Sequence, residues 1–367
     1  MVVKENKLPL VEYMASAYPD INLGGTMLIG CQHLLGSTAD MFYFLFEKGL
    51  KPENTYLLGK AYSTNNEVVH AIKERGVHVK ETTYDSHQSF DSQHRQGILS
   101  LLSHIKKTRN LPEFERIVIL DDGGKLHSLV QEELDDFSNI FGVEQTSSGI
   151  ETIKYINLQY PIINVARSRA KLNIESPFIA EAVIDRLRTY LKKNSEILIL
   201  GNGAIGNSIY ETLKKDYSLA RYDTVKGKSD LANLSELEKY DLVIGCTGKT
   251  SIFQDMFKYL KKGVILASAS SSDVEFSGTH LRRLVPRNED PHKEVIVNNI
   301  RLLNSGFPIN FDGSLHSVPP EKIQFTRALL FSAICEAEKI KNKKGIVELS
   351  QKVQDKLISE YILSSNG

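Results

Sequence analysis

A glycine-rich turn in the middle of the chain has the residue types and spacing needed to hold a dinucleotide phosphate. Three glycines with GxGxxG spacing form it: Gly201, Gly203 and Gly206. The apolar run 196–200 before the turn predicts a buried strand, and residues 207–215 after it have helical character. The first glycine permits the tight turn, the second lets the backbone approach a pyrophosphate, and the third lets helix and strand pack closely. The arrangement predicts a dinucleotide-binding strand, turn and helix.

An acidic residue at the expected place completes this pattern. The helix start, at Ala204 and Ile205, would offer free N–H groups to the phosphates. Asp223 follows the predicted strand 219–222, about 20 residues after the first glycine. A carboxylate there can accept hydrogen bonds from the adenine-side ribose, and it repels a 2′-phosphate. The sequence therefore predicts NAD rather than NADP, and the alternative is a tight turn that binds nothing.

The N-terminal part of the chain alternates strand-like and helix-like segments. Strands are expected at 26–31, 56–59, 77–80, 117–120 and 162–165, with helices such as 37–48 and 65–75 between them. This alternation predicts an α/β fold with a doubly wound, mainly parallel sheet. Ligands of such sheets bind at the carboxyl ends of the strands. Polar residues follow three of these strands, at His33, at 121–124 and at 166–171.

Each polar candidate also has a purely structural interpretation. His33 could be a catalyst or a partner of backbone groups at a helix start. Asp122 could carry acid–base chemistry or cap a helix beside the two glycines that follow it. Lys171 could act on a hydroxyl beside a nicotinamide or form an exposed ion pair with Glu175, one helical turn later. The hydroxyl-rich segment 145–149 suits a loop or a cofactor contact equally well.

The second half of the chain predicts a second α/β domain. A helix around 177–190 is expected to lead into it, and further strands are expected at 242–245, 264–267 and 295–297. Thr247 and Gly248 follow the first of these strands and suit contact with a nucleotide. We expect a substrate-binding domain at 1–182 plus about 318–350, which includes an amphipathic helix at 321–341. A Rossmann NAD-binding domain is expected at 183–317, and a C-terminal tail at 351–367.

Composition excludes several classes of protein. The formal net charge is zero, which argues against a nucleic-acid-binding surface. The three cysteines, Cys31, Cys246 and Cys335, fit no metal spacing, so no metal site is expected. Their low, odd number suggests a reducing compartment. No apolar run has the length of a signal peptide or a membrane span, so a cytoplasmic protein without a membrane partner is expected.

Several segments, taken in order from about Lys7 to about Ala337, resemble the S-adenosylhomocysteine hydrolase family. They are 30–33 with 37–39, 63–66, 119–126, 144–149, 163–165 with Lys171, 273–275, and Asn310. The resemblance implies two domains joined by a hinge, with NAD in the second and the substrate in the cleft. It also implies that NAD oxidises a ribose 3′-hydroxyl, that a 5′ thioether is then eliminated, and that the ketone is reduced again after water adds.

The resemblance also assigns roles to residues of this chain. Lys171 would be the base at the 3′-hydroxyl, and His33 and Asp122 would move protons at the 4′ and 5′ positions. Gln145 and Glu175 stand at two further catalytic or ribose-binding positions. The residues that would hold the NAD, besides the glycine turn, are Thr146, Ser147, Ser148, Asp223 and Asn310.

The chain departs from that family at several positions. The departures are Leu35, Ser37, Lys125, Gln145, Glu175, Ser176 and Ser271. Gln145 removes the charge of a ribose-binding glutamate, and Ser37 replaces a longer polar residue that reads adenine. We therefore expect a nucleoside-like substrate in an altered pocket. The alternatives are a non-catalytic NAD-binding paralogue with a regulatory role and an NAD-dependent dehydrogenase of a sugar-like alcohol.

The apolar surfaces of the glycine-motif domain and of the helix after Pro319 predict a homodimer. The family's tail, which ends in tyrosines and reaches the NAD of a neighbouring protomer, has no counterpart here, because the chain stops at Ser365-Asn366-Gly367. A tetramer built by exchange of tails is therefore not expected.

Overall fold

The structure, a computed structural model, describes residues 8–134, 138–225, 227–340 and 342–365. The chain forms two compact units. The first contains the described parts of 1–82, 94–175 and 319–367, and the second contains 83–93 and 176–318. Each unit is a parallel or mainly parallel sheet between helices, so the predicted fold class of two doubly wound α/β units is confirmed. The division falls at 175/176 instead of 182/183, and residues 351–365 belong to the first unit.

The first unit is built on a seven-stranded sheet with the order β13-β6-β5-β4-β1-β2-β3. All its pairings are parallel. Its strands are β1 (Thr26–Leu34), β2 (Thr55–Thr64), β3 (His78–Lys80), β4 (Arg116–Asp121), β5 (Ile140–Glu144), β6 (Pro161–Asn164) and β13 (Gly345–Glu348). The chain winds outward from β1 in one direction and from β4 in the other. The carboxyl ends of β1 and β4 therefore form the point where ligands of doubly wound sheets bind.

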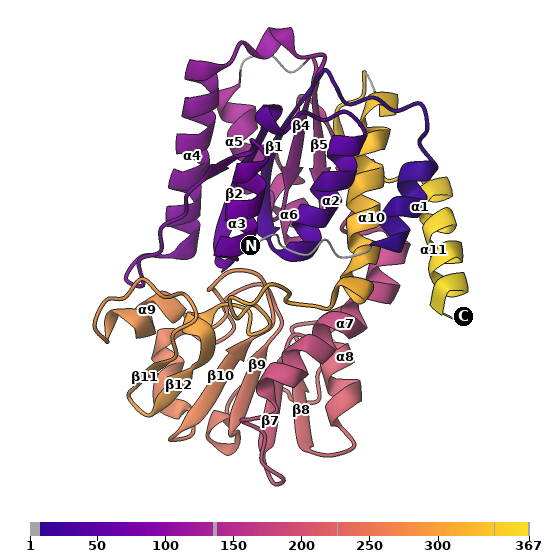
Figure 1. Cartoon of the computed structure of the whole chain (residues 1–367). Coiled ribbons are helices and arrows are strands. Elements are labelled where there is room, and N and C mark those ends of the chain that lie inside the picture. Colours follow the sequence, from indigo (N-terminus) through magenta and orange to yellow (C-terminus); the bar gives the residue numbers. More distant parts are fainter. Residues whose placement is uncertain (1–7, 135–137, 226, 341, 366–367) are drawn as a thin grey trace. The chain divides into compact units, whose positions relative to one another are not determined.

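Helices cover both faces of this sheet (Figure 1). On one face, α4 (Phe90–Thr108), α5 (Lys125–Glu133) and α6 (Ser147–Ile153) pack side chains such as Leu102, Val130 and Ile153 against Ile29 and Ile119 of the strands. On the other face lie α2 (Gly36–Glu47), α3 (Asn66–Glu74) and α10 (Pro320–Glu336). Burial of both faces explains why the central parts of β1 and β4, at 27–31 and 117–120, are apolar without polar alternation.

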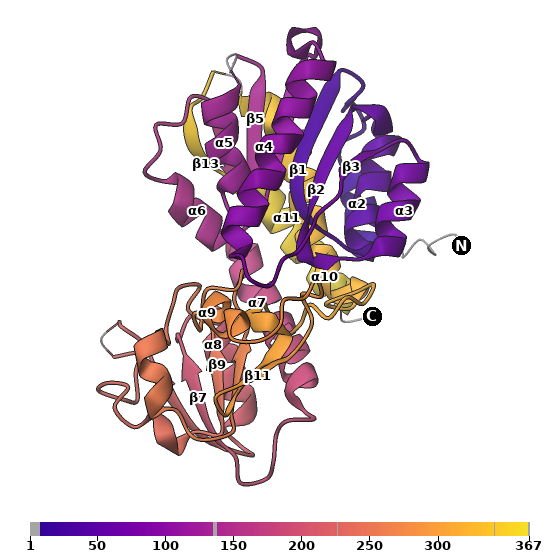
Figure 2. The same cartoon turned by 90° about the vertical axis from the view of Figure 1, so that its left-hand side faces the viewer.

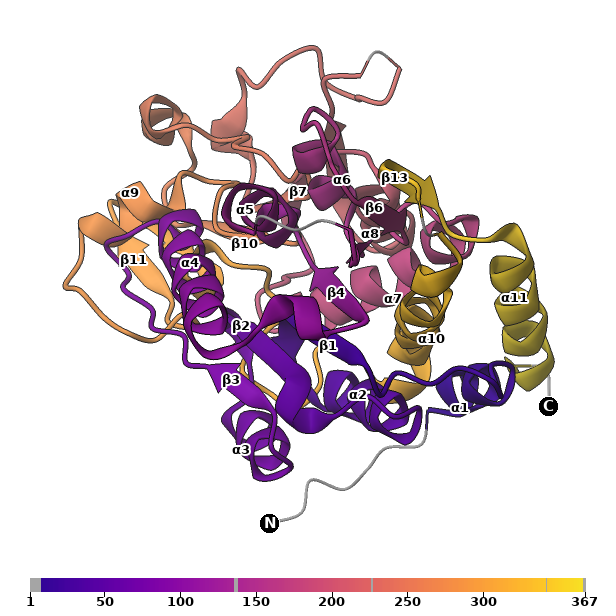
Figure 3. The ribbon, with the colours of Figure 1, turned by 90° about the horizontal axis from the view of Figure 1, so that it is seen from above.

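Segments from both ends of the chain complete the first unit. Strand β13 lies at the edge of the sheet opposite β3 (Figure 2), where it pairs with β6. Helix α10 packs against α1 (Pro9–Ser16), α2 and α11 (Gln351–Ser365), as the view in Figure 3 shows. The helix after Pro319 thus belongs to the first unit.

The second unit contains a six-stranded sheet with the order β11-β12-β10-β9-β7-β8, in which β11 alone is antiparallel to its neighbour. Its strands are β7 (Glu196–Leu200), β8 (Ser218–Tyr222), β9 (Leu242–Gly245), β10 (Val264–Ser268), β11 (Val295–Val297) and β12 (Ile300–Leu302). The winding reverses between β7 and β9, so their carboxyl ends form the corresponding ligand-binding point. The glycine turn follows β7, and Thr247 and Gly248 come shortly after β9.

Two apolar clusters cover the faces of this second sheet. On one face, Val183 and Leu187 of α7 (Arg169–Leu187) and Ile209 of α8 (Ala204–Leu213) pack against the strands. The other face is covered by α9 (Gly278–Arg283) and by short 3-10 helices, η3 (Leu237–Lys239) and η4 (Gln254–Tyr259). The remaining 3-10 helices of the chain are η1 (Pro52–Asn54), η2 (Leu111–Glu113), η5 (Leu303–Gly306) and η6 (Ala337–Ile340).

Helix α7 runs from the first unit into the second. It contains Pro177, which has no N–H and so removes one hydrogen bond from the helix interior. The division between the units falls just before this proline. Over the described residues, the structure contains no helix that combines the length and the apolar character needed to cross a bilayer.

Candidate functional site

In the first unit, Asp122 lies at the centre of a buried polar network. It follows β4, and its carboxylate accepts hydrogen bonds from Lys60 on β2 and from the Gln145 amide after β5. His33 Nε2 on β1 lies 3.2 Å from Asp122 Oδ2. These strands are neighbours in the sheet, and three of the four residues lie at or beyond carboxyl ends. The structure thus brings together three predicted site residues, His33, Asp122 and Gln145, and adds Lys60.

Burial and neighbouring charges set the protonation states of this network. The side chain of Asp122 is 1% exposed and that of Lys60 is 4% exposed. Burial by itself would raise the pKa of Asp122, but Lys60 and His33 outweigh it and hold the pKa well below its ordinary value. Burial by itself would lower the pKa of Lys60, and Asp122 reverses this, so the pKa is raised. Asp122 and Lys60 are therefore a charged pair at neutral pH.

His33 is a neutral imidazole held at both nitrogens. Burial lowers its pKa, and the nearby carboxylate of Asp122 opposes this only in part. Its Nε2 faces Asp122, and its Nδ1 is hydrogen-bonded to the Ser63 hydroxyl of β2. Its backbone oxygen accepts a hydrogen bond of 2.7 Å from the Thr38 hydroxyl at the start of α2. A neutral imidazole with a fixed carboxylate behind it is suited to accept a proton.

Lys171 and Glu175 continue the network along α7. Lys171 Nζ donates a hydrogen bond to the backbone oxygen of Gln145 and lies 3.4 Å from Glu175 Oε2. Glu175 Oε1 accepts a 2.9 Å hydrogen bond from the Thr326 hydroxyl of α10. The side chains of Lys171 and Glu175 are only 12% and 19% exposed, so this pair is not the solvated surface pair of the alternative interpretation. The predicted catalytic residues therefore form one connected set within the first unit.

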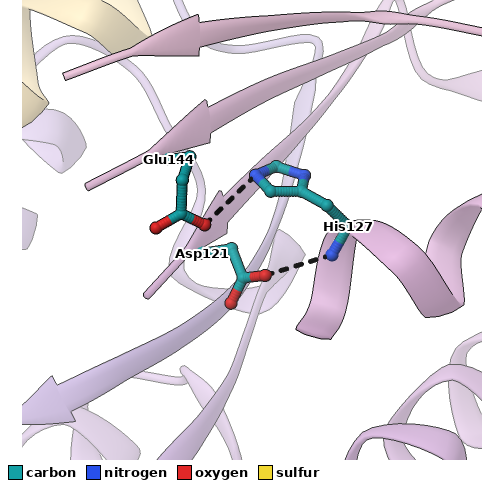
Figure 4. Close-up of side chains that lie close together, drawn as sticks. All are labelled: Asp121, His127 and Glu144. Carbon is teal, nitrogen blue, oxygen red and sulfur yellow. Dashed lines mark hydrogen bonds and ion pairs between the residues drawn. The ribbon is translucent and has the colours of Figure 1, made fainter. Parts of the chain in front are cut away.

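Three further buried side chains, Asp121, His127 and Glu144, lie next to this set in the chain (Figure 4). His127 Nε2 is 3.9 Å from Glu144 Oε2, and the His127 backbone N–H donates to Asp121 Oδ2 at 3.1 Å. Burial lowers the pKa of His127 to about 3, so its imidazole is neutral. Its ring nitrogens face the Tyr160 hydroxyl at 3.2 Å and the backbone oxygen of Val143 at 3.3 Å.

These three residues could offer ligands to a cation, but most of their oxygens are already engaged by backbone groups. Glu144 accepts hydrogen bonds from the N–H groups of Gly123 (3.2 Å), Gly124 (3.0 Å) and Thr146 (2.7 Å). Asp121 accepts one from the N–H of Asp122 at 2.8 Å. These bonds fix the two turns that carry Asp122 and Gln145. The cluster fits a structural role in positioning the site.

The predicted hydroxyl contacts lie at the start of α6 in the first unit. The Thr146 hydroxyl accepts a hydrogen bond from Gly149 N at 2.9 Å and donates one to Glu144 Oε1 at 2.8 Å, so it caps the helix. Ser147 and Ser148 are exposed. All three residues belong to the first unit, whereas the glycine turn belongs to the second.

In the second unit, the glycine turn has the backbone that its spacing predicts. Gly201 has a φ of +91°, and a Cβ there would lie 2.9 Å from the backbone of Cys246. A Cβ on Gly206 would lie 1.9 Å from the oxygen of Gly201, so helix α8 can approach the turn only because this residue is glycine. A Cβ on Gly203 would meet no described atom within 4 Å. No side chain caps α8 at this end.

Asp223 links this turn to the neighbouring strand. Its Oδ2 accepts a hydrogen bond from Asn202 N at 2.7 Å, and its Oδ1 accepts one from Val225 N at 2.8 Å. The residue is half-buried and follows β8, as predicted. Each carboxylate oxygen has a second lone pair that these bonds do not use.

The segment after β9 is held by a carboxylate whose role the sequence did not reveal. Glu275 is fully buried and accepts hydrogen bonds of 2.6 Å from both Thr247 N and Gly248 N. The hydroxyls of Ser251 and Ser270 also donate to it, at 3.0 and 2.5 Å. The backbone N–H groups of Thr247 and Gly248 are thus engaged within the protein.

Asn310 is buried near the carboxyl end of β10. The residue before it, Ile309, donates its N–H to Ser268 O at 2.8 Å. The predicted cofactor residues of the second unit therefore gather around the carboxyl ends of four of its strands, β7, β8, β9 and β10: Gly201, Gly203, Ala204, Ile205, Gly206, Asp223, Thr247, Gly248 and Asn310.

Sequence reasoning missed Lys60 and Arg327. Lys60 interrupts the apolar strand 56–62, and Arg327 lies between Phe325 and the apolar run 328–331 of α10. A charge inside an apolar run is the signal that could have found both, since such side chains are seldom buried without a specific partner.

No protein-family model matches the chain. It is 39% identical over 342 residues to the "Uncharacterized protein Rv0104" of Mycobacterium tuberculosis, covering 90% of this chain and 67% of that one. It is 23% identical over 273 residues to the adenosylhomocysteinase of Sulfurisphaera tokodaii, covering 68% of this chain and 62% of that one. It is 24% identical over 366 residues to the adenosylhomocysteinase of Thermococcus kodakarensis, covering 92% of this chain and 82% of that one.

Among solved structures, phosphoglycerate oxidoreductase from Vibrio cholerae matches with a TM-score of 0.45 and 10% identity, covering 85% of this chain and 99% of that one. The 3-phosphoglycerate dehydrogenase of Entamoeba histolytica matches with a TM-score of 0.42 and 11% identity, covering 86% of this chain and 96% of that one. Likeness at this level supports no functional assignment. The identity over two thirds of the mycobacterial protein is decisive, and the chain belongs to the protein family that includes Rv0104 of Mycobacterium tuberculosis.

Proposed function

We propose that this protein is an NAD-dependent enzyme of the adenosylhomocysteinase type, acting on a nucleoside thioether through transient oxidation of a ribose 3′-hydroxyl. The observation that carries the proposal is the connected set of His33, Asp122, Gln145, Lys171 and Glu175 at the switch point of the first sheet. The distant similarity to adenosylhomocysteinases supports it. The first unit would bind the substrate, and the second would bind NAD.

The residues of the second unit fit NAD. The open space above Gly203 would accept a pyrophosphate, and the uncapped start of α8 would offer N–H groups to it. Asp223 retains lone pairs for ribose hydroxyls. Thr247 and Gly248 are better suited to shape the site than to donate to phosphate, because Glu275 already accepts their N–H groups. Bound there, NAD would supply the oxidant for a secondary alcohol.

Lys171 and His33 are the residues proposed to move protons. Lys171 would exchange a proton with the substrate hydroxyl, with its Nζ positioned by the Gln145 oxygen and by Glu175. His33 is neutral and would accept the proton of the C–H beside the new ketone at Nδ1, in place of the hydrogen bond from the Ser63 hydroxyl. Asp122 would stabilise the resulting imidazolium. Because Lys60 and His33 hold the Asp122 pKa well below its ordinary value, Asp122 would orient His33 and would not itself carry a proton.

One observation favours a second candidate, a non-catalytic NAD-binding paralogue. Gln145 is a neutral residue that donates to Asp122, and no described residue donates to its buried Oε1. A carboxylate at this place would repel Asp122, so the network is built for a neutral side chain.

The nucleoside-like substrate, the predicted homodimer and the cytoplasmic location are predictions that accompany the first proposal.

Native mass spectrometry of the purified full chain would test for bound NAD. A panel of nucleoside thioethers would then be scored for NADH absorbance and for thiol release. Lys171→Met should lower both signals by roughly 100- to 10,000-fold, while NAD stays bound. Lys107→Met, at an exposed position of the same unit, is the matched control. Undiminished activity in Lys171→Met would refute the role of Lys171, and NAD binding without turnover of any thioether would favour the paralogue.

A further inference from the structure

Arg327 is a buried guanidinium with very little of its hydrogen-bonding capacity used. The residue is 4% exposed, on the face of α10 that packs toward α2. Its Nε donates to the Ser37 hydroxyl at 3.2 Å. Within the described part of the chain it makes no other hydrogen bond and no ion pair. Four N–H groups, on Nη1 and Nη2, therefore have no protein acceptor there.

Arg327 belongs to the same region as the proposed catalytic residues. The residue before it, Thr326, donates to Glu175, which in turn lies against Lys171. Ser37 is in the first turn of α2, directly after the strand that carries His33. Arg327 thus contacts α2, which follows the strand of His33, and the residue before it contacts Glu175 of α7.

The guanidinium remains charged in this environment. Burial lowers the pKa of Arg327 to about 10, and the carboxylates of Glu175, Asp122 and Asp40 act against that shift. A charged, desolvated guanidinium without acceptors is costly, so a site that keeps one is adapted to a ligand that supplies acceptors. An arginine offers donors only, so the ligand group that faces it must accept hydrogen bonds.

We propose that Arg327 recognises the O6/N7 edge of a 6-oxopurine nucleoside, with Ser37 holding the Nε end of the guanidinium; this deepens, and rests on, the proposed function. The O6/N7 edge presents two acceptors side by side, which matches a bidentate guanidinium. Adenine presents an N6 amino donor beside N7, so one N–H of arginine would meet another donor. The substrate base is therefore of the inosine or guanosine type, and adenine is discriminated against.

Isothermal titration of the NAD-supplemented full chain with inosine, guanosine and adenosine tests this without requiring turnover. These nucleosides contain no carboxylate that could bind Arg327, and they share the same ribose. A difference in affinity among them therefore reports on recognition of the base alone. Inosine or guanosine should bind roughly 10- to 100-fold more tightly than adenosine. The ratio between inosine and guanosine shows whether a 2-amino group is accepted. Arg327→Gln should reverse the preference, because a glutamine amide pairs with the N6/N7 edge of adenine.

Arg95→Gln is the matched control, since Arg95 is an exposed arginine of the same unit, with its side chain 52% exposed. It should leave all three affinities unchanged. Adenosine binding as tightly as inosine to the unmodified protein would overturn the inference while leaving the proposed function standing. Binding of none of the three nucleosides would overturn the proposed function and the inference with it. The comparison on the unmodified protein decides the matter even where Arg327→Gln does not fold.

Discussion

Lys60 on β2 and Asp122 after β4 form an ion pair whose two side chains are almost fully buried, 4% and 1% exposed. Removing one partner of this pair should destabilise the protein, because it leaves an uncompensated charge in a site that excludes water. Replacing Lys60 by methionine should therefore lower the free energy of unfolding by about 3–5 kcal/mol, as measured by urea denaturation.

The double variant Lys60→Met with Asp122→Asn is the control for that experiment. It removes both charges, so it should be more stable than Lys60→Met alone. A Lys60→Met protein as stable as the parent would show that the pair is not desolvated as the structure indicates.

His127 gives a prediction for the effect of pH on stability. Its folded-state pKa is about 3, because it is buried, whereas an unfolded histidine titrates near 6.5. Between these values the unfolded chain binds more protons than the folded chain. The contribution of His127 is thus complete above about pH 6.5 and is lost as the pH falls toward about 3.

The variant His127→Gln keeps a donor for Val143 O but does not titrate. From about pH 6 to about 4, the parent should lose roughly 1.4 kcal/mol per pH unit more than this variant. Asp121, whose pKa burial raises to about 6, titrates in both proteins and cancels in the comparison. Parallel stability curves over this interval would contradict the prediction.

Two alanine substitutions in the glycine turn should separate folding from cofactor binding. At Gly206 an added Cβ would lie 1.9 Å from the oxygen of Gly201, so Gly206→Ala should lower the melting temperature strongly. At Gly203 it would meet no described atom, and φ is −77°, so Gly203→Ala should fold normally. It should nevertheless weaken NAD binding by roughly tenfold or more, because the methyl group occupies the space that a pyrophosphate needs.

Calorimetric titration and thermal melting of both variants give the two readouts. If Gly203→Ala binds NAD as tightly as the parent protein, the glycine turn is not the site that binds the pyrophosphate.

Asp223 should make the protein prefer NAD to NADP. Its carboxylate lies at the end of β8 and would repel a 2′-phosphate. Asp223→Asn keeps an oxygen that can accept a hydrogen bond from Asn202 N but removes the charge. It should therefore lower the ratio of the affinity for NAD to the affinity for NADP by roughly tenfold, or about 1.4 kcal/mol. Thermal shifts with each dinucleotide would measure this. Stabilisation of the unmodified protein by NADP equal to that by NAD would count against the assignment.

The features that the sequence determined by itself are local ones. The glycine turn and its flanking strand and helix lie within 196–213, and steric limits on neighbouring atoms dictate which of those residues must be glycine. The alternation of apolar and polar segments likewise predicted the two α/β units, since both faces of a parallel sheet must be buried. The positions of His33 and Asp122 followed, because residues at strand ends meet at one edge of such a sheet.

The tertiary structure alone decided which side chains meet across long separations in the chain. Strand β5, short and interrupted by Gly142, and strand β13, which joins the sheet beside β6, were both missed because only their neighbours make them strands. Lys60 and Asp122 are 62 residues apart, and Ser37 and Arg327 are 290 apart. A buried charge is tolerated only where the folded chain brings it a partner or a ligand, and no pattern of neighbouring residues encodes that partner.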